Sequence, residues 1–286
     1  MTTPYWLQPS SGSTSNLSGT VEADVVVIGG GLCGTSAAYH LAQAGIAVAL
    51  VEARTISESA SGRNAGFLLQ GTAERYNRAV ELMGRDRARR IHQWSIENHT
   101  RMAETINAEG IECAYQKRGS LQLAGSPQEE QELIESAELL TEDGFEATLL
   151  DAAALPEALQ QAGFTMGVHL PADGELHPAR FVQGVGHAAQ RHGAQIFEGS
   201  RVMALDAGST GEVRVETEGG EIQAMEAHEA LSPMVMPVMS AVECPKFRPD
   251  RVRVVAYALP GTADRRVSGS RGPKPKWEGL MPTVYH

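Results

Sequence analysis

Two kinds of apolar pattern alternate near the start of the chain, one typical of buried strands and the other of a helix. Residues 23–29 read ADVVVIG, a continuous β-branched apolar run that is typical of a strand buried on both faces. From Leu32 to Ala44 apolar residues recur at helical spacing, and Gly45 ends that pattern. Residues 46–51 are again β-branched and apolar, and Glu52 comes directly after them. The pattern predicts a strand, a helix and a second strand between residues 24 and 52.

Helical and strand patterns continue to alternate as far as residue 231, where they weaken. Helices are expected at residues 73–109, with a break at Gly84, at residues 126–140 and at residues 178–192. Short strands are expected at residues 119–124, 195–197, 201–205, 212–217, 221–225 and 251–259. Residues 261–282 have the composition of a loop. This alternation predicts a mixed α/β fold.

The first 20 residues differ in composition from the rest of the chain. Residues 7–20 are rich in Ser, Thr, Gly and Asn, which bury little apolar surface, so a flexible arm is expected. Tyr5, Trp6 and Leu7 are large enough to fasten the tip of that arm to the rest of the protein.

A glycine-rich turn with the spacing G-x-G-x-x-G joins the first strand to the helix. Gly29 permits a tight turn, Gly31 lets the backbone approach a pyrophosphate, and Gly34 lets the helix pack closely on the strand. The helix N-terminus offers N–H groups and a positive dipole to phosphates. Glu52, 18 residues after Gly34, is placed to accept hydrogen bonds from ribose hydroxyls. The turn therefore predicts an ADP-binding site, and a glycine turn in an unrelated α/β protein is the alternative.

The segment after the second strand helps to distinguish FAD from NAD. Residues 57–67 read SESASGRNAGF and are too polar for a strand. Ser61, Arg63 and the backbone N–H groups of such a loop can turn toward a phosphate or a flavin. An ordinary surface turn is the alternative.

Together these motifs resemble a known family. The stretch DVVVIGGGLCGTSAAYHLAQAGIAVALVEA with the later SGRNAGF is similar to FAD-dependent amine and amino acid oxidases of the D-amino acid oxidase superfamily. That superfamily includes glycine and sarcosine oxidases and gamma-glutamylputrescine oxidase, and the arm with Tyr5-Trp6 resembles the last branch most. The likeness continues through residues 119–121 and 174–178 to Val202, and covers roughly residues 4–205.

The resemblance implies a cofactor and its contacts. In the family the glycine turn and the acid bind the ADP part of FAD, the SGRN loop runs beside the flavin, and a strand valine meets the adenine through its backbone. The residues so implied are Gly29, Gly30, Gly31, Leu32, Cys33, Gly34, Glu52, Ala53, Arg54, Ser61, Gly62, Arg63, Asn64, Ala65, Gly66 and Val202. The flavin carries the chemistry, so no catalytic residue is assigned.

Two features depart from the family pattern. An apolar strand is usual after the second hairpin, but residues 225–232 read MEAHEALS and are poor in β-branched residues. The family also continues well beyond this length, with further substrate-domain strands, a glycine-rich turn over the flavin ring and a last helix. We therefore expect a chain that lacks the C-terminal part of the family.

The expected architecture has two domains. The first is a Rossmann-like FAD-binding domain with a parallel sheet, formed by residues 21–100 and 165–240. The second is an antiparallel α+β substrate domain, formed by residues 101–164 and 241–286 and incomplete. Residues 1–20 are the arm.

Composition and charge narrow the classes of partner. Thirty-five acidic and 24 basic residues give a net charge of −11, which disfavours nucleic acid. No run approaches the roughly 20 apolar residues that span a bilayer, and the first residues lack a secretory signal. Cys33, Cys113 and Cys244 are far apart and lack metal-ligand spacing, so a reduced, cytoplasmic setting without a bound metal is expected.

The expected function is FAD-dependent oxidation of the carbon–nitrogen bond of a small amine or amino acid, with hydride transfer to the flavin. Two alternatives stay open. One is a truncated, catalytically inactive fragment that at most binds the nucleotide, and the other is an NAD-dependent dehydrogenase. The missing C-terminal part favours the first, so poor activity and less than one flavin per chain are expected. The SGRNAGF loop argues against the second.

Overall fold

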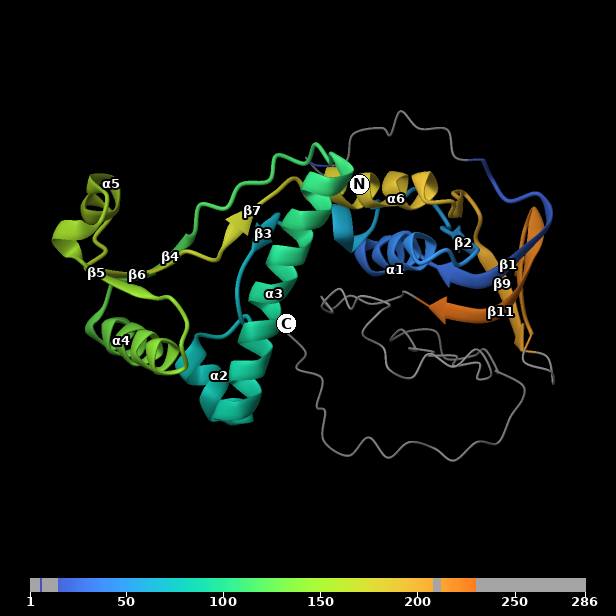
Figure 1. Cartoon of the computed structure of the whole chain (residues 1–286). Coiled ribbons are helices and arrows are strands. Elements are labelled where there is room, and N and C mark those ends of the chain that lie inside the picture. Colours follow the sequence, from blue (N-terminus) through green and yellow to red (C-terminus); the bar gives the residue numbers. More distant parts are fainter. Residues whose placement is uncertain (1–5, 7–14, 208–211, 230–286) are drawn as a thin grey trace. The chain divides into compact units, whose positions relative to one another are not determined.

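A six-stranded sheet in the order β8-β2-β1-β11-β10-β9 dominates one part of the fold (Figure 1). The computed structural model describes residues 6, 15–207 and 212–229. The sheet consists of β1 (Gly19–Ile28), β2 (Val48–Val51), β8 (Gln195–Phe197), β9 (Val202–Ala207), β10 (Val213–Thr217) and β11 (Gly220–Glu229). β8, β2, β1 and β11 are parallel neighbours, and β10 and β9 are added antiparallel. The expected Rossmann-like parallel sheet is confirmed.

Both faces of the parallel strands are covered. Val25, Val27 and Leu50 point to a core that they share with α1 (Leu32–Gln43) and α6 (Pro178–Arg191). Val26 and Ile28 point to the opposite core, which includes residues of β10 and β11. Burial on both faces explains why the first strand is a continuous apolar run rather than an alternating one.

The strand–helix–strand prediction for residues 24–52 is confirmed, but β1 begins at Gly19, five residues before the expected start. The register explains the difference, because Gly19 to Ala23 pair with Gly220 to Ala224 of β11. A Cβ on Gly220 would lie 2.2 Å from the carbonyl oxygen of Gly19, so this close pairing needs glycine. Leu17, just before the strand, is 1 % exposed.

β11 is longer than the sequence indicated. Its parallel pairing with β1 continues from Val25 opposite Glu226 to Ile28 opposite Glu229. The stretch MEAHEALS was expected to depart from the family pattern, yet its first five residues are a strand. Pairing with the buried β1 therefore overrides a composition that is weak in β-branched residues.

A second, three-stranded antiparallel sheet has the order β4-β6-β5. Its strands are β4 (Ser120–Ala124), β5 (Thr148–Asp151) and β6 (Met166–Leu170). β4 was expected, whereas β5 and the central β6 were missed. Their pairing joins residues 120–124, 148–151 and 166–170 in one sheet. The expected division into domains stays a prediction, and residues 230–286 lie outside the described residues, as does the strand expected at 251–259.

The expected helices are present beside these sheets. They are α2 (Tyr76–Met83), α3 (Arg85–Glu109), α4 (Pro127–Glu142) and α6, with Gly84 separating α2 from α3 as predicted. The remaining short elements are β3 (Phe67–Leu68), η1 (Ala60–Gly62), η2 (Ala152–Ala154), α5 (Glu157–Gln161) and β7 (Gly174–Glu175). β3 pairs with β7, so the end of the polar loop after β2 is fixed to the residues that precede α6.

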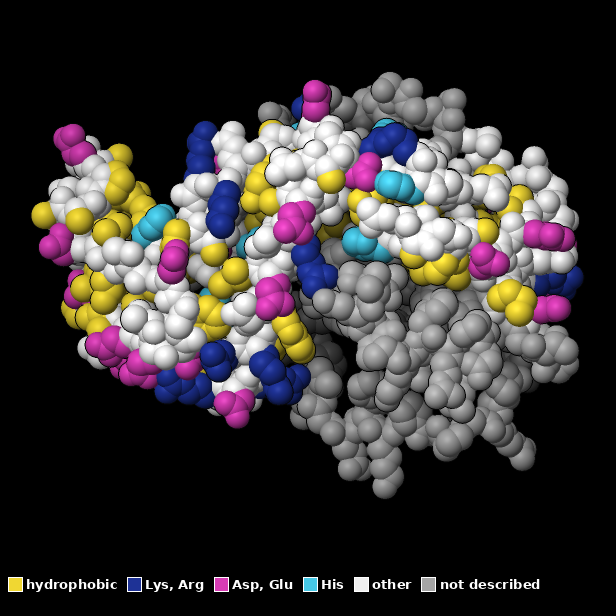
Figure 2. All heavy atoms as spheres, in the orientation of Figure 1, with side chains coloured by type: hydrophobic (Ala, Val, Ile, Leu, Met, Phe, Trp, Pro, Cys, Tyr) yellow, Lys and Arg dark blue, Asp and Glu magenta, His cyan; other side chains and the backbone are white. Residues whose placement is uncertain are grey.

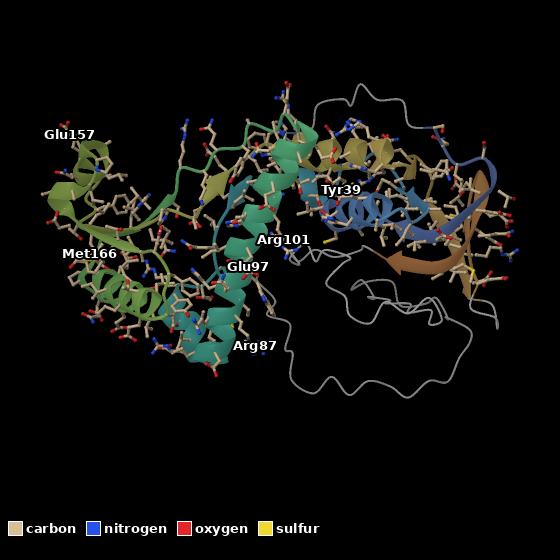
Figure 3. The ribbon with its side chains drawn as sticks, in the orientation of Figure 1. Tyr39, Arg87, Glu97, Arg101, Glu157 and Met166 are labelled. Atoms are coloured by element: carbon tan, nitrogen blue, oxygen red, sulfur yellow. The ribbon has the colours of Figure 1, made fainter. Side chains whose placement is uncertain are left out.

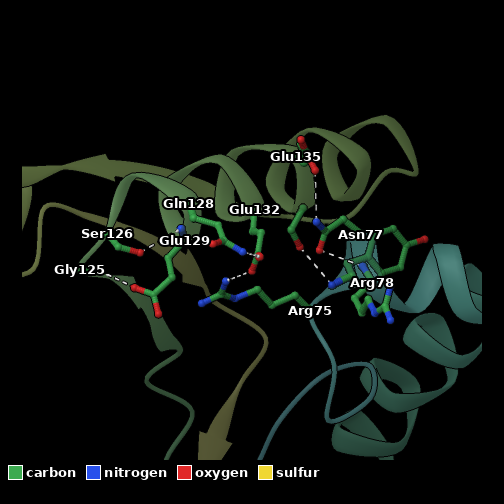
Figure 4. Close-up of polar contacts among 11 residues, drawn as sticks. Arg75, Asn77, Arg78, Gly125, Ser126, Gln128, Glu129, Glu132 and Glu135 are labelled. Atoms are coloured by element: carbon green, nitrogen blue, oxygen red, sulfur yellow. Dashed lines mark hydrogen bonds and ion pairs between the residues drawn. The ribbon is translucent and has the colours of Figure 1, made fainter.

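α4 begins as its sequence predicts (Figure 4). The Ser126 hydroxyl accepts a hydrogen bond from the Glu129 N–H, and the Glu129 carboxylate accepts one from the Gly125 N–H. Arg75, before α2, forms an ion pair of 2.6 Å with Glu132 on α4. Acidic and basic side chains accordingly lie side by side over α2 and α4 (Figure 2). Such exposed pairs contribute little to stability, so we assign the packing of α4 mainly to its buried Leu133.

The helices that frame the larger sheet meet at one carboxylate. Tyr39, labelled on α1 in Figure 3, donates its hydroxyl to Glu109 at the end of α3. Arg191 and His192, at the end of α6, bond to the same carboxylate at 2.8 Å each. Hydrogen bonds from His192, Arg191 and Tyr39 hold the pKa of Glu109 below its usual range. This cluster ties the C-terminal ends of α3 and α6 to α1, the helix that begins at the glycine-rich turn.

One buried histidine makes stability depend on pH. His92 is 4 % exposed, its ring packs against Phe145 and Tyr76, and its Nε2 lies 3.1 Å from Oε1 of Gln70. Burial lowers the pKa of His92 to about 4, and the carboxylate of Asp143 offsets only part of this. The unfolded chain, with an ordinary histidine pKa of about 6.5, therefore binds more protons than the folded chain between those values. The contribution of neutral, buried His92 to the free energy of unfolding is fully present above about pH 6.5 and is lost as the pH falls toward 4.

We expect the free energy of unfolding to be about 2 kcal/mol lower at pH 5 than at pH 7 through His92. Urea unfolding of the parent and of His92→Gln at both pH values measures this contribution. The difference between the two proteins should shrink at pH 5, because glutamine does not titrate. An unchanged difference between parent and variant at the two pH values would contradict the assignment to His92.

Candidate cofactor-binding site

The glycine-rich turn lies between the end of β1 and the start of α1. Gly29 has a φ of 111°, and its N–H donates to the carbonyl of Val51 at 2.8 Å. A Cβ on Gly30 would lie 3.0 Å from Cβ of Glu52, and a Cβ on Gly31 would lie 3.0 Å from the hydroxyl of Ser61. The turn therefore packs closely between Glu52, which follows β2, and the polar loop. Positions 30 and 31 both favour glycine for this reason.

The N-terminus of α1 is built to receive an anion. Gly31 is the N-cap and supplies no side-chain cap, and the first turn holds no acidic residue. The hydroxyl of Ser61 accepts a hydrogen bond from the Leu32 N–H at 2.9 Å, which ties the polar loop to this turn. N–H groups of a first helical turn and the positive end of its dipole attract phosphate. Gly34, in the same turn, is buried, as close packing on the strand requires.

Glu52 directly follows β2 and is held from several sides. Its Oε2 accepts from the Gly30 N–H at 2.7 Å and its Oε1 from the Arg54 N–H at 2.9 Å. Its own N–H donates to Phe197, and its carbonyl accepts from Ser200. A carboxylate has about four acceptor positions, so two backbone bonds leave capacity for ribose hydroxyls. The expected position of Glu52 at the end of the second strand is confirmed.

The loop of residues 57–66 is ordered by its own polar groups. Nε of Arg63 donates to the carbonyl of Glu58 at 2.6 Å. Nδ2 of Asn64 donates to the carbonyl of Ser61 at 2.9 Å, and its Oδ1 accepts from the Gly66 N–H at 2.9 Å. The side chains of Arg63 and Asn64 are largely exposed. The loop is thus a defined turn beside the helix N-terminus, and not a strand, as the sequence predicted.

Val202 is the first residue of β9 and lies two positions after Ser200, whose N–H donates to the Glu52 carbonyl at 2.8 Å. Two extended residues span about 7 Å, so the Val202 backbone is near the end of β2. Among the implied cofactor residues, the glycine turn, residues 52–54 and residues 61–66 are brought together by direct contacts. Val202 is placed near them indirectly, because Ser200, two positions before it, bonds to Glu52. Their contact with FAD stays a prediction.

Sequence reasoning missed two residues of this site. Ser57 has a φ of 69°, is 2 % exposed and donates its N–H to the Gly30 carbonyl at 3.0 Å. Its hydroxyl lies 3.3 Å from Nε2 of Gln183, which donates to it from α6. Glu198 accepts a hydrogen bond from the Ile56 N–H at 2.6 Å. Ser57 begins the polar stretch 57–67 but was not named as a site residue, and Glu198 lies outside every motif, because a positive φ at serine and a contact between residues 142 positions apart leave no local pattern.

The residue types and their arrangement fit an FAD cofactor. The first turn of α1 holds no acidic residue and its N-cap, Gly31, supplies no side-chain cap, which suits a pyrophosphate. Glu52, whose carboxylate accepts from the Gly30 N–H, suits a ribose. Within the described ranges, no cluster of His, Cys, Asp or Glu could hold a metal ion. No helix among the described residues is long and apolar enough to cross a membrane.

Comparison with known proteins identifies the family. Residues 24–265 match the DAO family, described as FAD dependent oxidoreductase, and the match extends past the limit of about residue 205 that the motifs indicated. The chain belongs to this family of FAD-dependent oxidoreductases, whose cofactor is FAD.

Individual relatives agree with the family. The chain is 30% identical over 213 residues to the gamma-glutamylputrescine oxidoreductase of Escherichia coli, covering 73% of this chain and 48% of that protein. It is 32% identical over 185 residues to a probable oxidoreductase, OrdL, of Haemophilus influenzae, covering 64% and 43%. The crystal structure of glycine oxidase from Geobacillus kaustophilus superimposes with a TM-score of 0.63 at 21% identity, over 73% of this chain and 55% of that one. The chain thus spans about half the length of the relatives it matches.

Proposed function

We propose that this chain binds FAD and serves the oxidation of a carbon–nitrogen bond in a small amine or amino acid. The observation that carries the proposal is the contact of Glu52 with the glycine turn, together with the attachment of Ser61 to the first N–H of α1. Relatives named gamma-glutamylputrescine oxidoreductase, glycine oxidase and sarcosine dehydrogenase all have names that point to amine or amino acid substrates.

Each group of residues has a role in this proposal. The N-terminal N–H groups of α1 hold the pyrophosphate, Glu52 with Ala53 and Arg54 holds the adenosine ribose, and Val202 meets the adenine through its backbone. Residues 61–66 run beside the flavin. A bound flavin supplies the redox chemistry by accepting hydride from the carbon next to nitrogen. The residues of this chain position the cofactor, and we assign none of them a catalytic role.

A cytoplasmic setting is part of the proposal. Cys33 and Cys113 are free thiols, and Cys113 is buried. Burial raises the pKa of Cys113, which makes its thiol unreactive. A protein with unpaired thiols suits a reducing compartment.

The test is to express the protein, measure its flavin-to-protein ratio by absorbance, and mix it anaerobically with a panel of amines and amino acids. Bound FAD whose absorbance is bleached by one class of amine or amino acid would support the proposal. FAD binding without bleaching by any amine would favour an inactive nucleotide-binding protein. Binding of NAD in place of FAD would favour a dehydrogenase and overturn the proposal.

A further inference from the structure

Trp6 makes a defined contact with the start of α6. Its ring lies edge-on to the ring of His177, with centroids 4.7 Å apart and an interplanar angle of 68°. Edge-to-face contact at this distance is a favourable arrangement of two aromatic rings. The sequence predicted that Tyr5, Trp6 and Leu7 fasten the tip of the N-terminal arm; the structure shows this contact for Trp6, and Tyr5 and Leu7 lie outside the described residues.

His177 is the N-cap of α6. Its Nδ1 accepts a hydrogen bond from the Arg180 N–H at 3.2 Å, and its own N–H donates to the Cys113 carbonyl at 2.7 Å. Burial lowers the pKa of His177, and the positive charge of Arg180 adds to the effect. The ring is therefore neutral near pH 7, which leaves Nδ1 free to accept the capping bond and puts the proton on Nε2. Trp6 covers the ring that performs this capping.

The loop beside the glycine turn rests on Leu176 and Pro178, the two chain neighbours of His177. The Leu176 N–H donates to the Gly66 carbonyl at 2.9 Å. A Cβ on Gly66 would lie 2.2 Å from the Leu176 carbonyl oxygen and 3.2 Å from Cδ of Pro178. Gly66 is in turn tied to Asn64 inside the loop. A shift of His177 therefore moves the backbone that carries the end of the loop.

We propose that Trp6 is a positioning residue for the loop of residues 57–66, acting through His177 and the backbone of Leu176. The role of that loop beside the flavin rests on the proposed function, whereas the mechanical connection does not. Trp6 thus contributes to the site although the glycine turn and the loop begin more than 20 positions later in the sequence.

Hydrogen exchange of the flavin-free protein tests the connection directly. The variants are Trp6→Ala and Trp6→Phe, which keeps an aromatic ring, with Trp94→Ala as the matched control because Trp94 is 52 % exposed on α3. We expect the amides of Gly66, Leu176 and Arg180 to exchange about two- to tenfold faster in Trp6→Ala, from the usual worth of an aromatic pair. Trp6→Phe should restore most of the protection, and Trp94→Ala should leave these amides unchanged.

A second measurement addresses the cofactor. FAD titration of the same proteins should give a dissociation constant that is about two- to tenfold higher for Trp6→Ala and close to the parent value for Trp6→Phe. Unchanged exchange at residues 62–66 and 176–180 in Trp6→Ala would overturn the proposal. Equally faster exchange in β1, β2 and α4 would also overturn it, because Trp6 would then stabilise the whole fold. If the parent binds no FAD but Trp6→Ala still speeds exchange in the loop, the proposed function is refuted and the role of Trp6 stands.

Discussion

Replacing Gly66 by alanine is expected to lower the free energy of unfolding by on the order of 4 kcal/mol and to displace the loop beside the glycine turn. Gly66 has a φ of 80°, a conformation that disfavours a side chain. The new Cβ would also lie 2.2 Å from the Leu176 carbonyl oxygen, which belongs to the backbone and cannot rotate away. Relief of that contact requires breaking the hydrogen bond between the Leu176 N–H and the Gly66 carbonyl.

Gly45→Ala is the matched control for this experiment. Gly45 has nearly the same φ, 81°, but no atom lies within 4 Å of the position its Cβ would take. Its substitution should therefore cost only the conformational penalty, about 1–2 kcal/mol. Chemical denaturation of both variants separates the two contributions. Equal losses for Gly66→Ala and Gly45→Ala would show that the contact with Leu176 is relieved without cost.

Gly66 also illustrates what a motif conveys and what it omits. From the sequence, Gly66 was predicted to be a cofactor-binding residue because it belongs to the SGRNAGF loop. In the structure its backbone packs on residues 176–178, which are more than 100 positions away. A motif thus identified the right residue, but the physical requirement at that position is contact between two distant segments of the backbone.

The same distinction explains which elements were predicted. β1, α1 and β2 follow from local patterns, since each has the periodicity or the apolar run that its environment demands. β5 and β6 are short, and β6 contains Gly167, so neither carries a strong pattern of its own. Their strand structure depends on pairing with each other and with β4. β11 likewise continues to Glu229 because β1 supplies a partner, and not because of its composition.

In the site, the residues that would contact the pyrophosphate and the ribose could be predicted from the sequence. The residues that only hold the neighbouring backbone in place could not. Gly29, Gly31 and Glu52 recur wherever a helix N-terminus meets a pyrophosphate and a ribose, so their spacing alone is informative. Ser57 and Glu198 hold the residues after β2 through backbone N–H groups. Any polar residue type in a loop is compatible with such a role, so composition does not single them out.

Replacing Glu52 by alanine is expected to weaken FAD binding about ten- to hundredfold. Hydrogen bonds to a charged carboxylate are each worth roughly 1.5–3 kcal/mol, and the ribose hydroxyls would lose theirs. The substitution also leaves the N–H groups of Gly30 and Arg54 without their acceptor, so the turn itself is less well fixed. Titration of the flavin-free proteins with FAD, monitored by flavin fluorescence, measures the change.

Two further variants identify the origin of that loss. Glu22→Ala removes an exposed carboxylate from the same strand–helix–strand unit, remote from the turn, and should bind FAD as the parent does. Glu52→Gln keeps one oxygen to accept from the Gly30 N–H but loses the charge, so its affinity should fall between the parent and Glu52→Ala. If Glu52→Ala and the parent bind FAD equally, the carboxylate does not hold the ribose and the prediction is wrong. The glycine turn would then bind the pyrophosphate without help from the residue directly after β2.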